Sequence, residues 1–223
     1  ALTRDEKKYL DIFKNWNLDN EAQQQGATVF KVWWDSLMTT TYGDEYRQTN
    51  LPLPWPDDPV LLSGLAKDSA YSFADDINTP QKEMDKDVIQ TSFKKAAEQL
   101  LQLDNEGLLQ WSDYKQSAVM HLLKIPAFSR ESLLSNGGDG IINAFTKTHG
   151  PSWKMVVEMT DGINAYGIYP GGQAGNPGSK YYDNFINDYL AGKYYKLLFV
   201  SQDVIQKTNN LKGKITFSKL ISK

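Results

Sequence analysis

The sequence predicts an α+β fold, in which a helical N-terminal half is followed by antiparallel strands and a further helix. Apolar residues recur at helical spacing through much of the first half, and ten of the sixteen glycines fall between Gly137 and Gly178. In addition, two strand-like segments flank an Asp161-Gly162 turn. We therefore expect a helical segment over residues 1–110 with a proline-rich wrapping loop, and a β-rich segment over residues 111–223.

The first half predicts three helices. Residues 3–16 begin with Thr3 as N-cap and have Glu6 three positions later, which is the spacing of a capping box. A second helix is expected from residue 21 to about 41 and a third from about 84 to 103, because apolar side chains recur there at i, i+3 and i+4. These apolar stripes need a partner surface, so the helices should pack together.

Between the second and third helices lies the segment LPLPWPDDP, residues 51–59. Its prolines fix φ and exclude regular structure, so we expect an extended wrapping loop anchored by Trp55. Docking of this segment in an aromatic groove is the alternative. Trp33 and Trp34 have two interpretations, a stacking platform or core packing, and core packing is favoured.

The second half predicts mostly strands. KQSAVMHL, residues 115–122, suits a strand, and GGDGIINAF, residues 137–145, suits a turn and a short apolar strand. Residues 152–159 and 164–169 should pair as an antiparallel hairpin over 152–169.

The chain after this hairpin should form a loop, a helix and a last strand. The glycine-rich loop, YPGGQAGNPGS, spans residues 169–179. A helix should begin near Tyr181 and stop at Gly192, and a strand should follow at residues 213–219.

Composition excludes several classes of protein. The chain has 223 residues, 40% of them hydrophobic, with a net charge of -3 and a pI near 5.5. An acidic balance argues against nucleic acid as a partner. The absence of Cys excludes disulfides and a cysteine nucleophile, and no apolar run approaches the ~20 residues of a membrane span. The chain begins at Ala1 without an initiator Met, so we expect a processed product or an excised piece.

The glycine-rich loop fits no phosphate-binding motif. Its spacing matches neither G-x-x-x-x-G-K-[ST] nor G-x-G-x-x-G, which disfavours a phosphate cradle and leaves a structural corner or a disordered loop. His121 and His149 have no second ligand at metal spacing, so a zinc site is disfavoured. No G-x-S-x-G elbow is present either.

Two longer motifs point to a family. THGPSWKMVVEM, followed by AYGIYPGGQAGNPGSKYYDNFINDYLAGKYYKLLF, closely resembles the C-terminal end of the penicillin amidase family of N-terminal nucleophile hydrolases. In that family an H-G-P-S-W-R-M-V-V strand precedes a Y-P-G-G-Q-S-G-N-P-G-S loop. WSDYKQSAVMHLLKIPAF, GGDGIINAF and LDIFKNWN also resemble the family. Lys154 stands where the family commonly has Arg, and Ala174 where it commonly has Ser.

The resemblance implies an incomplete αββα sandwich and a particular mechanism. In such enzymes a Ser exposed by internal cleavage attacks the amide carbonyl, and its own α-amine acts as the base. The nucleophile and the Asn of the oxyanion hole belong to segments upstream of this chain, and Ala1 has no hydroxyl. We therefore expect the C-terminal portion of a larger amidase, inactive by itself, which cleaves a linear amide bond when the remaining segments of its own precursor complete it.

The resemblance also implies a substrate class, a metal ion and a cellular location for the enzyme. The substrate would be a small-molecule amide, with penicillins, cephalosporins, acyl-homoserine lactones and lipopeptides all open. No cofactor is expected in this segment; a calcium ion in the full-length enzyme would be held upstream. The expected location is the periplasm or the exterior of a bacterium.

Three residues are candidates for supporting the active site. Glu158 is an ionisable group among apolar strand residues, with an ion pair to Lys154 as its structural alternative. Gln173 and Asn176 are amides that would either face the site or hold the glycine-rich loop.

The two histidines have structural interpretations, and the whole chain has a second functional one. His149 should stabilise a turn, and His121 should be a core residue of an apolar strand. The alternative to an amidase portion is a non-catalytic binding or interaction module on the same scaffold, which would use the Trp-rich helical half as its surface.

Overall fold

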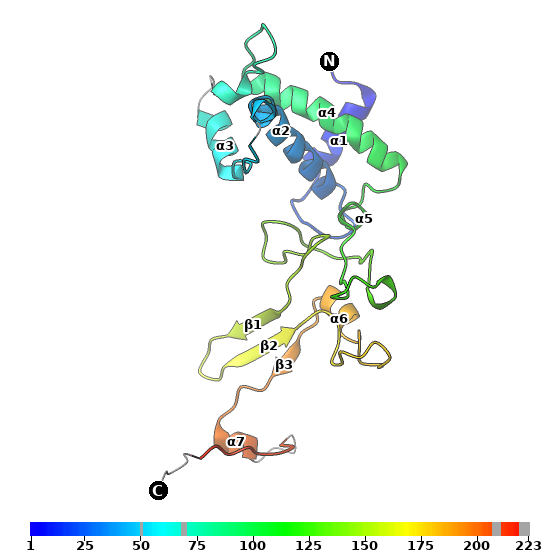
Figure 1. The fold of residues 1–223 in the computed structure, drawn as a ribbon, viewed down its shortest axis with the longest axis vertical. Coiled ribbons are helices and arrows are strands. Elements are labelled where there is room, and N and C mark those ends of the chain that lie inside the picture. The colour runs from blue at the N-terminus through cyan, green and yellow to red at the C-terminus, as the bar shows by residue number, and fades with distance from the viewer. Residues whose placement is uncertain (50, 68–70, 207–210, 219–223) are drawn as a thin grey trace. The chain divides into compact units, whose positions relative to one another are not determined.

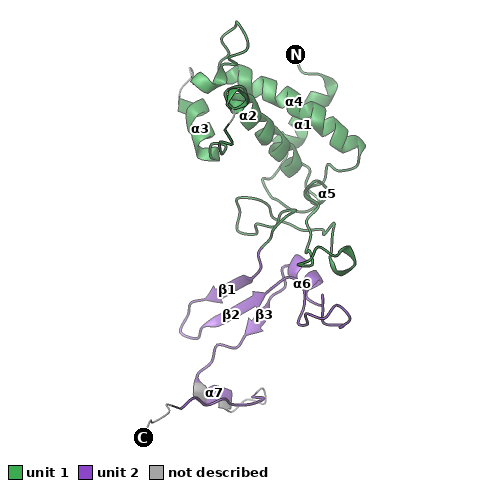
Figure 2. Ribbon diagram, viewed as in Figure 1, with its two compact units in different colours: residues 1–150 green, residues 151–223 purple. Residues whose placement is uncertain are grey.

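The computed structural model describes residues 1–49, 51–67, 71–206 and 211–218. The chain forms two compact units, Ala1–Gly150 and Pro151–Lys223 (Figure 2). Unit 1 contains the helices α1 (Arg4–Lys14), α2 (Gly26–Gln48), α3 (Asp58–Lys67), α4 (Asp85–Asn105) and α5 (Trp111–Lys115), with the short 3₁₀ turns η1 (Ser72–Ala74) and η2 (Pro126–Phe128). Unit 2 contains β1 (Lys154–Glu158), β2 (Asn164–Ile168), α6 (Ile186–Leu190), β3 (Tyr195–Leu197) and α7 (Gln202–Gln206). The mixture of helices and antiparallel strands confirms the α+β class.

The three predicted helices correspond to α1, α2 and α4, which pack against one another in unit 1 (Figure 1). The capping box of α1 is confirmed, since the Thr3 N–H donates to Glu6 Oε2 at 2.7 Å and the Glu6 N–H donates to Thr3 Oγ1 at 3.2 Å. α2 begins later than predicted, at Gly26, and continues to Gln48. The core that these helices share consists of Tyr9, Val29, Val32, Ala96, Ala97, Leu100 and Leu109. Burial of one such Val or Leu side chain stabilises the unit by about 1.5–3 kcal/mol.

The proline-rich segment is anchored as predicted. The Trp55 ring stacks on Tyr46, with centroids 4.8 Å apart and planes 9° apart, and the Tyr46 hydroxyl donates to the Pro54 carbonyl at 2.9 Å. The segment is shorter than predicted, because α3 already begins at Asp58. Proline is tolerated in a first helical turn, where its missing N–H has no helical partner.

The two adjacent tryptophans pack against the helical core and are both partly buried. Trp33 contacts Phe13 edge-on at 5.6 Å and donates from Nε1 to Ser92 Oγ at 3.2 Å. Trp34 donates from Nε1 to Asp58 Oδ1 at 2.8 Å. Core packing is therefore confirmed for both residues, and Trp34 also lines a surface groove.

The strand predicted at residues 115–122 is wrong. Lys115 ends α5, Gln116 adopts a left-handed conformation with φ 49°, and a single antiparallel bridge joins Val119 to Arg130. The short strand predicted in residues 137–145 is also absent. The carbonyls at the two ends of this segment, those of Gly137 and Phe145, accept hydrogen bonds from the Lys115 ammonium instead.

The hairpin in unit 2 is confirmed. β1 pairs antiparallel with β2, and the register places Lys154 opposite Ile168 and Glu158 opposite Asn164. β3 adds a third strand on the other side of β2, in the order β1-β2-β3. The sequence analysis predicted no strand at β3, which lies between the expected helix stop at Gly192 and the strand expected at 213–219.

The predicted helix after the glycine-rich loop begins later than Tyr181, at Ile186, because the preceding residues are held in turns. It stops as predicted before Gly192, whose φ of +68° favours glycine. Of the strand predicted at 213–219, residues 213–218 have no regular structure and Lys219 lies outside the described residues. Ile215 and Phe217 are largely exposed, so no sheet face covers them.

Candidate functional site

The glycine-rich loop is a closed corner. The Phe185 N–H donates to the Gly171 carbonyl at 2.9 Å, and the Ala174 N–H donates to the Tyr181 carbonyl at 3.0 Å. Gly172 lies so close to the returning chain that a Cβ there would stand 2.2 Å from the Tyr181 carbonyl oxygen. The glycines therefore allow a tight approach of two backbone segments, which is the structural-corner interpretation of this loop.

Gln173 and Asn176 lie in this corner and both are exposed. The Asn176 side chain holds the loop, since its Oδ1 accepts from the Gly178 N–H at 3.0 Å. Gln173 takes part through its backbone, because its N–H donates to Asn184 Oδ1 at 3.2 Å. The Gln173 amide points to no described partner within the corner, and its role at an active site stays a prediction.

Glu158 ends β1 and is exposed. Its Oε2 accepts a hydrogen bond from Asn164 Nδ2 at 3.1 Å, across the first pair of the hairpin. The alternative ion pair with Lys154 is wrong, because that ammonium lies 3.8 Å from the centroid of the Tyr189 ring and donates to the Tyr189 carbonyl at 3.4 Å. Burial lowers the pKa of Lys154.

The three candidates are not joined to one another. Among the described residues no hydrogen bond or ion pair links Glu158, Gln173 and Asn176, and each is engaged with its own neighbours in the hairpin or the corner. A nucleophile activated by a base requires such a link. In the described chain the Glu158 and Asn176 side chains hold the hairpin and the corner, and a role of all three residues at an active site stays a prediction.

The two histidines differ in their roles. His149 stabilises a turn as predicted, with Nδ1 3.2 Å from the hydroxyls of Thr146 and Thr148. His121 is half-buried in a loop, where its Nδ1 accepts from the Leu123 N–H at 3.2 Å and its ring contacts Phe128. The prediction that His121 is a core residue of a strand is wrong, because the chain turns there.

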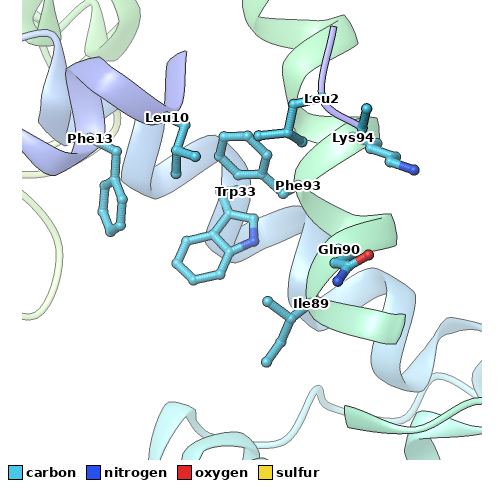
Figure 3. Close-up of a pocket in the computed structure, with 9 residues that line it drawn as sticks. Leu2, Leu10, Phe13, Trp33, Ile89, Gln90, Phe93 and Lys94 are labelled. Atoms are coloured by element: carbon cyan, nitrogen blue, oxygen red, sulfur yellow. The ribbon is translucent and has the colours of Figure 1, made fainter. Parts of the chain in front are cut away.

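Unit 1 contains an apolar cavity of about 530 Å³ between α1, α2 and α4 (Figure 3). Its walls include Leu10, Phe13, Trp33 and Phe93, and the ammonium of Lys94 is directed away from the rings. The sequence predicted core packing for Trp33 but did not indicate the space beside it. The cavity can accommodate an apolar group, and its lining holds no acid–base pair.

The sequence analysis did not identify Glu45, a carboxyl whose pKa is raised in the folded chain. Burial, and then the neighbouring Asp44 carboxyl, raises the pKa of Glu45 to about 7. Glu45 Oε2 is buried without a hydrogen-bond partner, whereas Asp44 Oδ2 accepts from the Ile77 N–H at 2.8 Å. The signal in the sequence was the pair of adjacent acids, Asp44 and Glu45, near the end of the long helix α2.

The residues that the structure describes contain neither a metal-binding cluster nor a membrane-spanning helix. No group of three or more His, Cys, Asp or Glu side chains is arranged to hold a metal ion in that part of the chain. No helix in the same part is long and apolar enough to cross a membrane.

Comparison with known proteins gives one clear match. The family model described as Penicillin amidase matches residues 1–206, which covers both units up to the end of α7. Comparison with curated proteins finds no match.

Proposed function

Since the chain belongs to the penicillin amidase family, we propose that it is the C-terminal portion of an amidohydrolase that cleaves a linear acyl–amine bond. The Ser nucleophile and the oxyanion Asn lie in other segments of the same precursor. Unit 2 supplies strands to the αββα sandwich, and the helices of unit 1 form part of its outer wall. The match over residues 1–206 is the observation that supports this proposal most strongly.

The exposure of β1 supports the incomplete sandwich. Met155 and Val156 are neighbours and therefore point to opposite faces of the sheet, yet they are 54% and 53% exposed. Val157 and Met159 are exposed as well. A strand that is apolar on both faces is typical of a sheet covered on both sides, so further strands and helices should bury β1 in the complete enzyme.

The proposal has three further parts, of which the last two rest on the family resemblance. Glu158, Gln173 and Asn176 support the active site through the hairpin and the corner. A calcium ion, where the complete enzyme binds one, is held by upstream residues. The enzyme acts in the periplasm or outside a bacterial cell.

The test is an amide hydrolysis assay with two samples. The isolated 223 residues should give no turnover of phenylacetyl amides or acyl-homoserine lactones, with a mock purification from the same host as the blank. The chain produced together with the rest of its precursor should give turnover, and β1 should gain hydrogen-exchange protection. Turnover by the isolated chain above the blank would show that the nucleophile lies within it.

A non-catalytic binding module is the second candidate, and the apolar cavity of unit 1 favours it. The two candidates differ in what the complete gene encodes. A Ser at an internal cleavage point, followed by the oxyanion Asn, is required by the amidase. A complete gene without that Ser would leave only the binding module.

A further inference from the structure

A second hollow in unit 1 combines aromatic walls with carboxylates. This aromatic groove has a volume of about 790 Å³ and is lined by α2, α3, the proline-rich segment and the loop at 139–140. Phe30, Trp34 and Trp55 supply the rings, and Asp35, Asp58 and Asp139 supply the carboxylates. The cavity between α1, α2 and α4, by contrast, has no carboxylate in its lining.

The rings of the groove are fixed in place by contacts behind them. Trp34 is tied to α3 through its hydrogen bond to Asp58 and packs on Phe30, with centroids 5.6 Å apart. Trp55 stacks on Tyr46 and is nevertheless 48% exposed. Both indoles therefore present surface to the groove while the rest of each ring is held by the protein.

The groove carries an excess of negative charge. Among the described residues that line it, Lys31 is the one cation, and the Lys31 ammonium pairs with Asp35 Oδ1 at 2.6 Å. Asp58 accepts only a neutral indole N–H, so its charge is not cancelled. Within the described residues no ion pair reaches Asp58 or Asp139.

Asp139 is positioned by the loop that carries it. The carbonyls of Gly137 and Phe145, on either side of Asp139, accept hydrogen bonds from the buried Lys115 ammonium at 2.9 and 3.1 Å. The loop is therefore fixed at both ends, and the exposed residue Asp139 lines the groove from a defined backbone.

We propose that the aromatic groove binds an organic ammonium ion with an apolar or aromatic body. Indole faces attract cations through the ring quadrupole, and nearby carboxylates add a Coulomb attraction. An anion would be repelled by Asp58 and Asp139, and a neutral ligand would gain only the apolar contacts. This inference does not depend on the amidase activity, because none of the groove residues belongs to the proposed hydrolytic site.

The experiment compares three probes of similar size on the full 223-residue chain. Benzyltrimethylammonium, benzyl alcohol and benzenesulfonate are titrated while the six Trp indole N–H signals are followed by NMR. Trp34→Phe and Trp55→Phe assign the two groove signals. The cation should shift these signals and bind about 10-fold more tightly than benzyl alcohol, and benzenesulfonate should bind most weakly. The preference should decrease as NaCl is added.

Charge-removing variants locate the site. Asp58→Asn and Asp139→Asn should each weaken binding of the cation by about 3- to 10-fold. Asp139 is exposed in a loop, so its variant tests the proposal without disturbing packing. Asp161→Asn is the matched control, since it removes the same charge from the exposed hairpin turn of unit 2 and should change affinity less than 2-fold.

Four outcomes of these titrations would overturn the proposal. Equal affinity for the three probes, no shift of the Trp34 and Trp55 signals, or unchanged binding in both Asp variants would each contradict an ammonium site. Loss of binding in the Asp161 variant alone would place the cation in the other unit and contradict it too.

Discussion

Lys115→Met should loosen the loop that the ammonium holds. Lys115 is only 7% exposed, and its Nζ donates to the carbonyls of Ser135 at 2.8 Å, Gly137 at 2.9 Å and Phe145 at 3.1 Å. Methionine has nearly the same length and volume, so it fills the space without the donor. The variant therefore removes the hydrogen bonds of a buried cation and keeps most of its packing.

The magnitude follows from the acceptors that lose their donor. Gly137 O also accepts from Trp111 Nε1 at 2.6 Å, so the Ser135 and Phe145 carbonyls bear most of the loss. An acceptor deprived of its donor in a buried site costs about 1–3 kcal/mol. Methionine carries no charge, so the variant no longer has the free-energy cost of burying an ammonium, and this offsets part of the loss. We expect a net loss of about 2–3 kcal/mol in the free energy of unfolding of unit 1.

The assay is urea unfolding followed by Trp fluorescence, with hydrogen exchange of the 135–145 segment as a local measure. Lys147→Met is the matched control, because Lys147 is exposed and donates to Gln116 Oε1 at 3.1 Å. That control should change the free energy by less than about 0.5 kcal/mol. A loss below about 1 kcal/mol in Lys115→Met, with unchanged protection of the segment, would refute the reasoning.

Three further perturbations test other parts of the fold. The pKa of Glu45 is about 7 in the folded chain, above its ordinary value of 4.5. Between these two pH values the folded state binds a proton that the unfolded state has lost. The free energy of unfolding should therefore fall as the pH rises from 4.5 to 7. Glu45→Gln should abolish that slope and, after discounting for solvent screening, stabilise the chain by about 1 kcal/mol at pH 8 in urea titrations; an unchanged slope contradicts the assignment. Gly172→Ala, whose Cβ would meet a backbone carbonyl, should lower the melting temperature of unit 2, whereas Gly175→Ala, which has open space, should not; equal melting temperatures contradict the tight corner. Met155→Lys together with Val157→Lys should reduce self-association of the isolated chain in sedimentation experiments, and an unchanged association would mean that β1 is not the adhesive surface.

Local chemistry made several elements predictable from sequence. The capping box of Thr3 and Glu6 joins residues three apart, and the Asp161-Gly162 turn with alternating flanks specifies the hairpin. Gly192 stops its helix because a left-handed residue there favours glycine. The family could also be predicted from the sequence, because its motifs are continuous stretches of the chain.

The tertiary structure decided the features that depend on residues far apart in the chain. Residues 115–122 and 137–145 have strand-like composition, yet Gln116 adopts a left-handed conformation and the end carbonyls of the second segment bind the Lys115 ammonium. Asp58 and Asp139 reach one groove only after α2, α3 and the loop have packed. A sequence pattern records which side chains are neighbours within one element, because that spacing is fixed by the backbone. Which elements meet, and therefore which charges and rings share a surface, is determined by packing across the whole unit.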